Sequence, residues 1–526
     1  MKKIYALALM VIMSACQKED FEDFYADPSK LNTTTVEKQF TGFIFSNKDY
    51  ALPSYWNYFV IHRITNNRYT QAVTWANDID QYIPGGGAVN DRWNTYYNFM
   101  AQYRELQKVF NSLSEEDQKL RRIYMLAATV YLYDHTQQVV DLHGDIPFSE
   151  AGMLSTNGGD YNVSYPKYDS AESIYTTMLD DLKSIADELN TIEVNSGIQV
   201  GFEKQDLINN GDLTAWKRYV NSLRLRILTR VSGASNFSSR AQTEIGQIVG
   251  NPTAYPIVNT NAENIAFEVK TLGVYFNDNN EFERGLEDWN GNVAGKKLVD
   301  HMVNNKDPRL TYVLEPGVEA ENGKYETISQ LENSSTITEK INAGTLTIYN
   351  RSTLSRNSYF PGILISASQV QFMLAEYYLK AGNETMASAT YEKGIRESIN
   401  FYKEVRSISN NSVSPVPANI TEAQIVAYLA TPEVQWTPAK SANEKLALIG
   451  LQKWLHFNVV QPLENWTEVR RLKLPALTFW VDQASNQTTV PARWNYPNSE
   501  KAYNEANYNA VASKDNLTSK LFWDTK

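Results

Sequence analysis

Apolar side chains recur at spacings of three and four residues over long stretches of this chain. One such face runs from Ile174 to Leu189, and another runs from Trp216 to Ile227. Side chains at these spacings lie on one side of an α-helix, where another element must cover them. We therefore predict helices from about Ser170 and over residues 213–230. The pattern as a whole predicts a mainly α-helical protein.

Two further amphipathic helices are predicted over residues 366–399, with a turn at Gly382 and Asn383 between them. Helical hairpins of this size build tetratricopeptide-like scaffolds. The chain shows no strict repeat of about 34 residues, which a regular tetratricopeptide array would have. We therefore expect hairpins that are similar in shape but not repeated in sequence.

The pattern changes between residues 251 and 365. Helical periodicity fades there, and Gly, Asn, Pro and β-branched residues become frequent. We expect loops and small strands over the helical base, with short strands within residues 336–349. Residues 36–526 are expected to form a single domain that contains residues 251–365 as a loop-rich insertion.

The first residues have the pattern of a secretory signal peptide. Two lysines precede an apolar run over residues 4–13, which is shorter than the about 20 residues of a permanent membrane span. Ser14 and Ala15 then precede Cys16, the one cysteine of the chain, in an order that resembles the lipobox of bacterial lipoproteins. We expect a signal peptide over residues 1–15, lipidation of Cys16 and a flexible acidic tether over residues 16–35. The alternative is an ordinary secreted protein.

Charge and motif content argue against several classes of function. The formal net charge is −11, whereas nucleic-acid binding needs clustered Lys and Arg. The chain has no glycine-rich phosphate loop and no H-E-x-x-H motif, so we expect no cofactor. His135 and His143 lie near three aspartates, but polar residues at a helix end more often form caps and turns than metal sites. Binding of a structural calcium ion stays an open alternative, and the sequence identifies no ligands for it.

Six motifs in order along the chain resemble those of one known family. They are Val139–Ala151, Trp216–Arg226, Asp307–Arg309, Gln371–Tyr378 with Gly382 and Tyr391, Gln452–Leu455 with Glu464–Trp466 and Arg470–Arg471, and Arg493–Glu500 with Asn504. Each motif is weak alone, but six in this order behind a lipobox are specific. The chain resembles the SusD/RagB-like nutrient-uptake lipoproteins of the bacterial outer membrane, although His143 stands where the family usually has Tyr.

This resemblance implies a SusD-like fold, with tetratricopeptide-like hairpins as the scaffold and a loop-rich part that carries the ligand site. It implies a lipid-anchored protein on the cell-surface side of the outer membrane, acting as a hinged lid on a SusC-like TonB-dependent barrel. The ligand would be an oligosaccharide or an oligopeptide, and no enzyme activity is expected. Trp216, Trp454 and Trp466 are expected to pack helices, and the motif arginines to pair with carboxylates between helices.

Two loops combine aromatic rings with amide, carboxylate or guanidinium groups. The candidate ligand-binding residues are Trp75, Asn77, Asp78 and Tyr82 in the first loop, and Tyr275, Asn277, Arg284, Asp288 and Trp289 in the second. Rings stack on sugars or on peptide side chains, and the polar groups bond hydroxyls or amides. The three glycines at positions 85–87 predict that the first loop extends as far as residue 87. Alternatively, Trp75 and Trp289 only hold their loops together or contact the barrel.

We favour capture of an oligomeric nutrient without chemistry over two alternatives. A surface hydrolase on a helical scaffold would need two facing carboxylates, which a sequence cannot place. A structural adaptor for the barrel would bind no ligand. The surface where a ligand would enter would be flat and would have few aromatic residues.

The lipid anchor gives the first testable prediction. Cys16→Ala removes the thiol that would carry the lipid, so the variant is expected to lose palmitate labelling and to leave the membrane fraction. Metabolic labelling and cell fractionation measure both effects. Continued labelling together with membrane retention would contradict the anchor.

Overall fold

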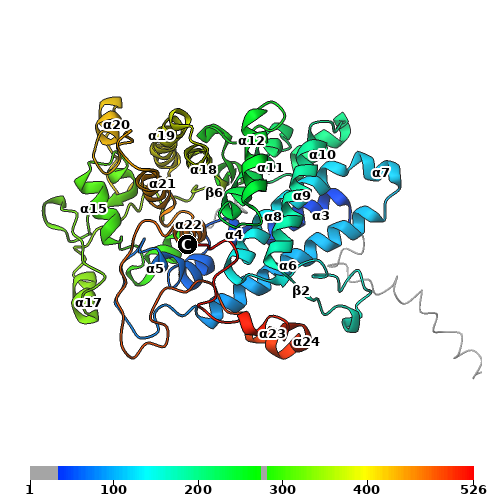
Figure 1. The fold of residues 1–526 in the computed structure, drawn as a ribbon, viewed down its shortest axis with the longest axis horizontal. Helices are drawn as coiled ribbons and strands as arrows, with labels where there is room; N and C mark the ends of the chain where they lie inside the picture. The colour runs from blue at the N-terminus through cyan, green and yellow to red at the C-terminus, as the bar shows by residue number, and fades with distance from the viewer. Residues whose placement is uncertain (1–33, 274–280) are drawn as a thin grey trace, which may run out of the picture.

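The computed structural model describes residues 34–273 and 281–526, and helices dominate it (Figure 1). The helices up to residue 250 are α3 Val36–Ser46, α4 Lys48–Ala51, η1 Trp56–His62, α5 Asn66–Tyr69, α6 Gly86–Asn111, α7 Glu115–Leu120, α8 Arg122–His143, η2 Tyr161–Val163, α9 Ala171–Leu189, α10 Ser196–Gln205, α11 Leu213–Val231 and α12 Ser238–Gly250. Those that follow are η3 Asn261–Glu263, α13 Val269–Leu272, α14 Glu281–Glu287, η4 Asp288–Asn290, α15 Lys296–Asn304, α16 Leu310–Val313, η5 Glu321–Gly323, α17 Ser334–Asn342, α18 Ala367–Lys380, α19 Glu384–Ile408, α20 Glu422–Leu429, α21 Ala442–Phe457, α22 Pro462–Leu472, α23 Asn498–Tyr503, α24 Glu505–Tyr508 and η6 Ala512–Lys514.

The helical prediction is confirmed, including where several helices begin. Ser170 and Ser366 are the N-caps of α9 and α18, and their hydroxyls accept hydrogen bonds from Ser173 N at 3.1 Å and Gln369 N at 3.3 Å. Such caps satisfy backbone N–H groups that have no partner within the helix. The predicted hairpin over residues 366–399 is formed by α18 and α19, and Gly382 takes a positive φ of 72° in the turn between them.

Helices pack against their neighbours to form the scaffold. Helices α8, α9, α11 and α12 stand side by side, and α18 packs on both α19 and α21 (Figure 1). The buried side chains of α8, α9, α11 and α12 belong to one large apolar core. A second core lies under α5, η1, α14, α21 and α22, and a third joins α18, α19 and α21. Trp216, Trp454 and Trp466 are buried in these cores, as predicted. No helix within residues 34–273 or 281–526 is both long and apolar enough to cross a membrane.

The strands are short and form three antiparallel pairs in the described chain. The pairs are β1 Ile146–Pro147 with β2 Tyr168–Asp169, β3 Ile265–Phe267 with β6 Gly362–Ile365, and β4 Leu314–Glu315 with β5 Ile348–Tyr349. Ile265 pairs with Ile365, so the β3–β6 pair brings the two ends of the irregular region 251–365 together.

One local prediction is right only in part, and another is wrong. Residues 336–349 were expected to hold short strands, and β5 lies there, but residues 336–342 belong to helix α17, for which Asn333 is the N-cap. The Asn333 side chain accepts a hydrogen bond from Thr336 N at 2.9 Å, so a polar cap favours a helix despite the β-branched residues. The glycines at 85–87 do not form a loop, because helix α6 begins at Gly86.

The motif arginines pair with carboxylates in most cases. Arg226 bonds Asp134 at 2.5 Å between α11 and α8, and Arg471 bonds Glu376 at 2.6 Å between α22 and α18. Arg470 differs from the prediction, since its guanidinium donates to the backbone carbonyls of Asp141 and Ala492 and lies 3.6 Å from the Trp466 ring centroid.

A buried cluster of charges joins α18, α21 and α22. The Glu376 carboxylate accepts hydrogen bonds from Arg471 at 2.6 and 2.7 Å and from Lys453 at 3.2 Å. Lys453 and Arg471 also donate to Glu468, each at 2.7 Å. The two cations outweigh the cost of desolvation and hold the pKa of both carboxyl groups below the usual range. Ionised Glu376 and Glu468 therefore stabilise the fold above a pH of about 4.5, and this contribution is lost as the pH falls below it.

Removing one charge from this cluster should destabilise the protein. Glu376→Gln keeps the side-chain shape but leaves buried cations with one carboxylate fewer, so we expect a loss of about 3–5 kcal/mol in the free energy of unfolding. Urea denaturation at neutral pH measures it. The matched control is Glu422→Gln, which removes a carboxylate from the solvent-exposed pair with Arg396 and should change the midpoint little. Equal midpoint shifts in the two variants would contradict the importance of burial.

Candidate functional site

The structure brings the two predicted loops together. Val73 and Ala294 form an isolated antiparallel β-bridge, and Thr74 N donates to Val293 O at 2.8 Å. The Thr74 hydroxyl also donates to Ala294 O at 3.0 Å. Backbone pairing of this kind fixes the position of one loop against the other. The loops are 220 residues apart in the sequence, so no local pattern could have shown that they meet.

Three candidates of the first loop point into the protein. Trp75 is only 6% exposed and donates from Nε1 to Gln81 Oε1 at 2.7 Å. Asn77 donates from Nδ2 to the Gln330 and Glu332 carbonyls, both at 2.9 Å, and the Tyr82 hydroxyl donates to Trp480 O at 2.7 Å. These polar groups are satisfied internally and both rings are buried, so the three side chains offer no surface to a ligand. We therefore remove them from the candidate site and assign them to holding the loop.

The other candidates are placed differently. Asp78 and Arg284 are exposed, and Asp288 is partly exposed. Tyr275 and Asn277 lie outside the described residues. Trp289 is 83% exposed, which is unusual for the largest apolar side chain. Its backbone has φ 59° and ψ 33°, a left-handed conformation that a bulky residue rarely adopts. Exposure together with strained backbone is typical of residues kept for binding.

A column of rings and guanidinium groups stands beside this tryptophan. The Tyr55 and Phe59 rings are stacked, with centroids 5.0 Å apart and planes 13° from parallel. The Arg284 guanidinium lies 4.6 Å from the Tyr55 centroid, and the Arg63 guanidinium lies 4.1 Å from the Phe59 centroid. Arg63 also donates to the backbone carbonyl of Asp288 at 3.3 Å, which ties the column to the turn that carries Trp289.

Two features of the backbone hold this column in place. Helix η1 is a π-helix, a form that occurs mostly in short pieces and often at functional sites. Helix α14 packs closely against η1 because Gly285 has no side chain: a Cβ there would lie 2.8 Å from Tyr58 Cβ. This contact brings Arg284 over Tyr55. Tyr55, Phe59 and Arg63 were not among the predicted site residues, although four aromatic residues within 55–59 were a signal of an aromatic surface.

Tyr55, Phe59, Arg63, Arg284, Asp288 and Trp289 are called the aromatic surface below. Ring faces can stack on the apolar faces of sugars, and guanidinium groups can donate several hydrogen bonds to hydroxyl or carbonyl oxygens. Burial lowers the pKa of Arg63 from its usual value. Glu287 is next to Asp288 in the sequence. Its carboxylate accepts hydrogen bonds from the Ser355 hydroxyl and from the Arg356 guanidinium, the latter at 2.7 Å. The arrangement therefore fits binding better than acid–base chemistry.

The paired loops also border a groove with a volume of about 800 Å³. Gln71, Val73, Thr74 and Gly295 form part of its wall. Leucines, lysines and glutamates supply half of the rest, and no Trp, Tyr or Phe is among its lining residues. The groove thus differs in chemistry from the aromatic surface.

The suggested metal site at His135 and His143 does not form. Both imidazoles are buried, and burial lowers the pKa of each to about 3. Asp134 is occupied by Arg226 and by the Tyr219 hydroxyl at 2.7 Å. Across residues 34–273 and 281–526, no three His, Cys, Asp or Glu residues are grouped so that they could hold a metal ion.

Comparison with known proteins agrees with the fold. A family model for SusD-like proteins, described as starch-binding and associating with the outer membrane, matches residues 32–497. The chain belongs to the SusD-like family. This assignment confirms the resemblance carried by the six motifs, and it accounts for the tetratricopeptide-like scaffold. A search of curated proteins found no significant match.

Solved structures of SusD-like proteins share the fold over almost their whole length. A chitin-binding protein aligns with a TM-score of 0.71 at 22% identity, covering 93% of this chain and 99% of its own. A chitin-binding SusD homologue from Flavobacterium johnsoniae gives 0.71 at 19% identity, with 93% and 99% coverage. A SusD homologue from Bacteroides fragilis gives 0.69 at 21% identity, with 94% and 100% coverage.

The different placement of the two tryptophans predicts different effects on stability. Trp75→Ala should lower the free energy of unfolding by about 3–5 kcal/mol, because it leaves a cavity and removes the indole hydrogen bond. Trp289→Ala should change it by less than about 0.5 kcal/mol, because the side chain is exposed. Denaturant titration of both variants measures this difference. Similar losses in both would show that Trp289 is packed in solution.

Proposed function

We propose that this SusD-like protein captures a glycan at the aromatic surface and delivers it to a SusC-like TonB-dependent transporter in the outer membrane. In this proposal the lipid on Cys16 anchors the protein on the outer face of the cell. The acidic segment behind Cys16 gives the protein the freedom to act as a lid on the transporter. The protein itself performs no chemistry on the ligand.

The exposed Trp289 beside the Tyr55–Phe59 column is the observation that carries this proposal. An indole ring that is 83% exposed offers a large apolar face to a partner, and its N–H group can donate a hydrogen bond. The column adds two partly exposed aromatic rings and two guanidinium groups within the same surface. Flat rings combined with forked donors match the alternating apolar faces and hydroxyl groups of a sugar chain.

The family description and the names of two relatives favour a glycan over other ligands. The family model is described as starch-binding, and two of the similar structures are of chitin-binding proteins. Starch and chitin are both polymers of pyranose rings, so an aromatic surface could serve either.

An oligopeptide is the second candidate ligand, and the groove of about 800 Å³ favours it. Its leucines and its charges of both signs suit peptide side chains better than sugar rings. A peptide bound there would depend on the groove and not on Trp289. The same set of variants can therefore distinguish the two ligands.

The proposed function is tested by removing the exposed indole. A glycan and peptide array first identifies a ligand, and calorimetry then compares wild type with Trp289→Ala. We expect at least about a tenfold loss of affinity for the glycan, as is typical when a central aromatic contact is truncated. Tyr503→Ala is the control, because Tyr503 is 78% exposed but lies on α23, outside the aromatic surface.

Each outcome has a distinct meaning. Unchanged glycan affinity in Trp289→Ala would contradict the placement of the site. Binding of peptides alone by the wild-type protein would contradict the glycan and favour the groove. Turnover of a glycan by the purified protein would contradict a function in binding alone.

A further inference from the structure

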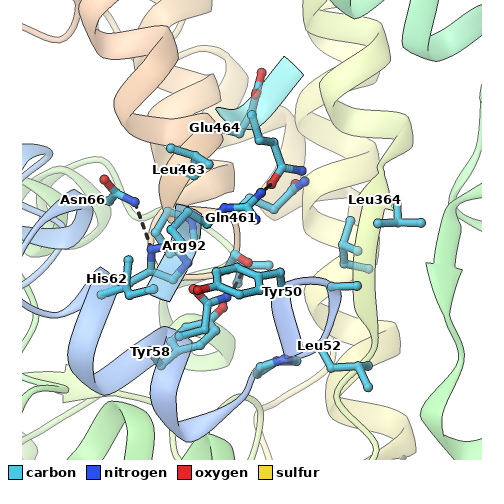
Figure 2. Close-up of a pocket in the computed structure, with 18 of the residues that line it drawn as sticks. Tyr50, Leu52, Tyr58, His62, Asn66, Arg92, Leu364, Gln461, Leu463 and Glu464 are labelled. Atoms are coloured by element: carbon cyan, nitrogen blue, oxygen red, sulfur yellow. Dashed lines mark hydrogen bonds between the residues drawn. The ribbon is translucent and has the colours of Figure 1, made fainter. Parts of the chain in front are cut away.

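A small cavity with both polar and apolar lining residues lies on the inner side of helix η1. Its volume is about 90 Å³, and Asn57 and His62 of η1 line it together with Arg92 of α6 (Figure 2). One water molecule needs about 15 Å³, so the volume of this cavity is several times larger than that of a single-water site. Trp494 and Leu364 close other parts of its wall, and Gln461 and Glu464, which are partly exposed, belong to the lining as well.

Arg92 is a buried cation without a carboxylate partner. The side chain is 2% exposed, and Figure 2 shows it between His62, Gln461 and Tyr50. Its Nη1 has no hydrogen-bond partner, and its Nη2 makes one long bond of 3.5 Å to Gln138 Oε1. One face of the guanidinium is covered by the Tyr50 ring, whose centroid is 4.3 Å away. An isolated buried cation costs several kcal/mol, so this group is expected to have a partner.

Three other buried arginines have the carboxylate partner that Arg92 lacks, whereas Arg470 donates to two backbone carbonyls instead. Arg226 pairs with Asp134 at 2.5 Å, Arg309 with Asp307 at 2.6 Å and Arg471 with Glu376 at 2.6 Å. For Arg92 no carboxylate oxygen lies within 4.0 Å in the described chain.

The carboxylates near the cavity are already engaged. Asp91 accepts the hydrogen bond of the Tyr50 hydroxyl. Glu464 bonds Arg230 at 2.7 Å. The negative charge of Asp91 acts on Arg92 without a direct bond, so a direct partner for the guanidinium must come from the cavity.

A second donor faces the same space. The Asn66 amide donates from Nδ2 to His62 Nδ1 at 2.9 Å, as the dashed line in Figure 2 shows. Burial keeps this imidazole neutral, so its one ring hydrogen is on Nε2 when Nδ1 accepts. No hydrogen bond from His62 Nε2 to another described residue is formed. His62 thus adds a neutral N–H group to the cavity that Arg92 lines.

We propose that this cavity binds a small monovalent anion, such as a halide, against Arg92 Nη1 and His62 Nε2. One negative charge compensates the one unpaired guanidinium, and water fills the remaining volume. A cation is excluded by the charge of Arg92. A larger polyanion such as phosphate would need more donors than these two residues supply.

The anion would support the aromatic surface from behind. Asn57 and His62 face the cavity from η1, whereas Tyr55 and Phe59 on the same stretch of chain form the outer column. An anion that satisfies Arg92 and His62 would stabilise the short π-helix between the two surfaces. This role does not depend on the identity of the glycan or of the transporter.

Crystallography with bromide tests the site directly. Crystals of the ectodomain are soaked in sodium bromide, and anomalous diffraction is recorded at the bromine edge. The expected result is an anomalous peak inside the cavity, next to Arg92. Density at the level of water and without an anomalous signal at that position would overturn the proposal.

Thermal unfolding provides an independent test in solution. Bromide is titrated at constant ionic strength, with sodium gluconate as the balancing salt, because the gluconate anion is too bulky for the cavity. The unfolding midpoint of the wild type should rise with bromide, since an anion that binds the folded state stabilises it. The midpoint of Arg92→Gln should not respond.

Arg122→Gln is the matched control, because it removes a guanidinium from a surface pair with Glu188 and should keep the full bromide response. An equal response in Arg92→Gln and the wild type would overturn the proposal. If Arg92→Gln does not fold, the anomalous map of the wild-type protein decides the question.

Discussion

Charges that have been removed from water hold the scaffold helices together. Glu376 on α18, Lys453 on α21, and Glu468 and Arg471 on α22 satisfy one another in the interior. Arg230 extends the network to α11 and, through Asp141 at 3.1 Å, to α8. A buried charge is tolerated only when its partners are well placed, so each pair restricts how these helices can be arranged. Apolar contacts alone tolerate more repacking.

The residues of the aromatic surface depend on this scaffold but are not part of its regular packing. They lie on a π-helix, a short α-helix and a strained turn, which meet because Gly285 permits close approach of α14 to η1. Loops and irregular segments on a rigid base commonly carry function, because their side chains are not needed for the core. Helix η1 has two roles in this arrangement. Its outer side contributes to the aromatic surface, and its inner side borders a cavity with an unpaired cation.

Much of the scaffold could be predicted from sequence, whereas most of the site could not. Helical periodicity and serine caps are local signals, so the helices after Ser170 and Ser366 begin where they were expected. Of the segment 336–349, the end forms strand β5 as expected, whereas residues 336–342 are helical because Asn333 caps a helix there. For the site, Trp289 was named from its loop. Arg63 was not, because its partner Asp288 is 225 residues away and no local pattern relates them.

The sequence by itself determined the helical class, the six family motifs and the expectation of an anchor at Cys16, because each of these is written in neighbouring residues. It could not separate Trp75 from Trp289, since both are tryptophans beside Asn and Asp in irregular segments. The tertiary structure separated them. Gln81 and Gln330 draw the first loop inward, while a left-handed turn directs the second indole outward. Whether an aromatic ring is buried or exposed depends on contacts between distant segments, and only the folded chain brings these together.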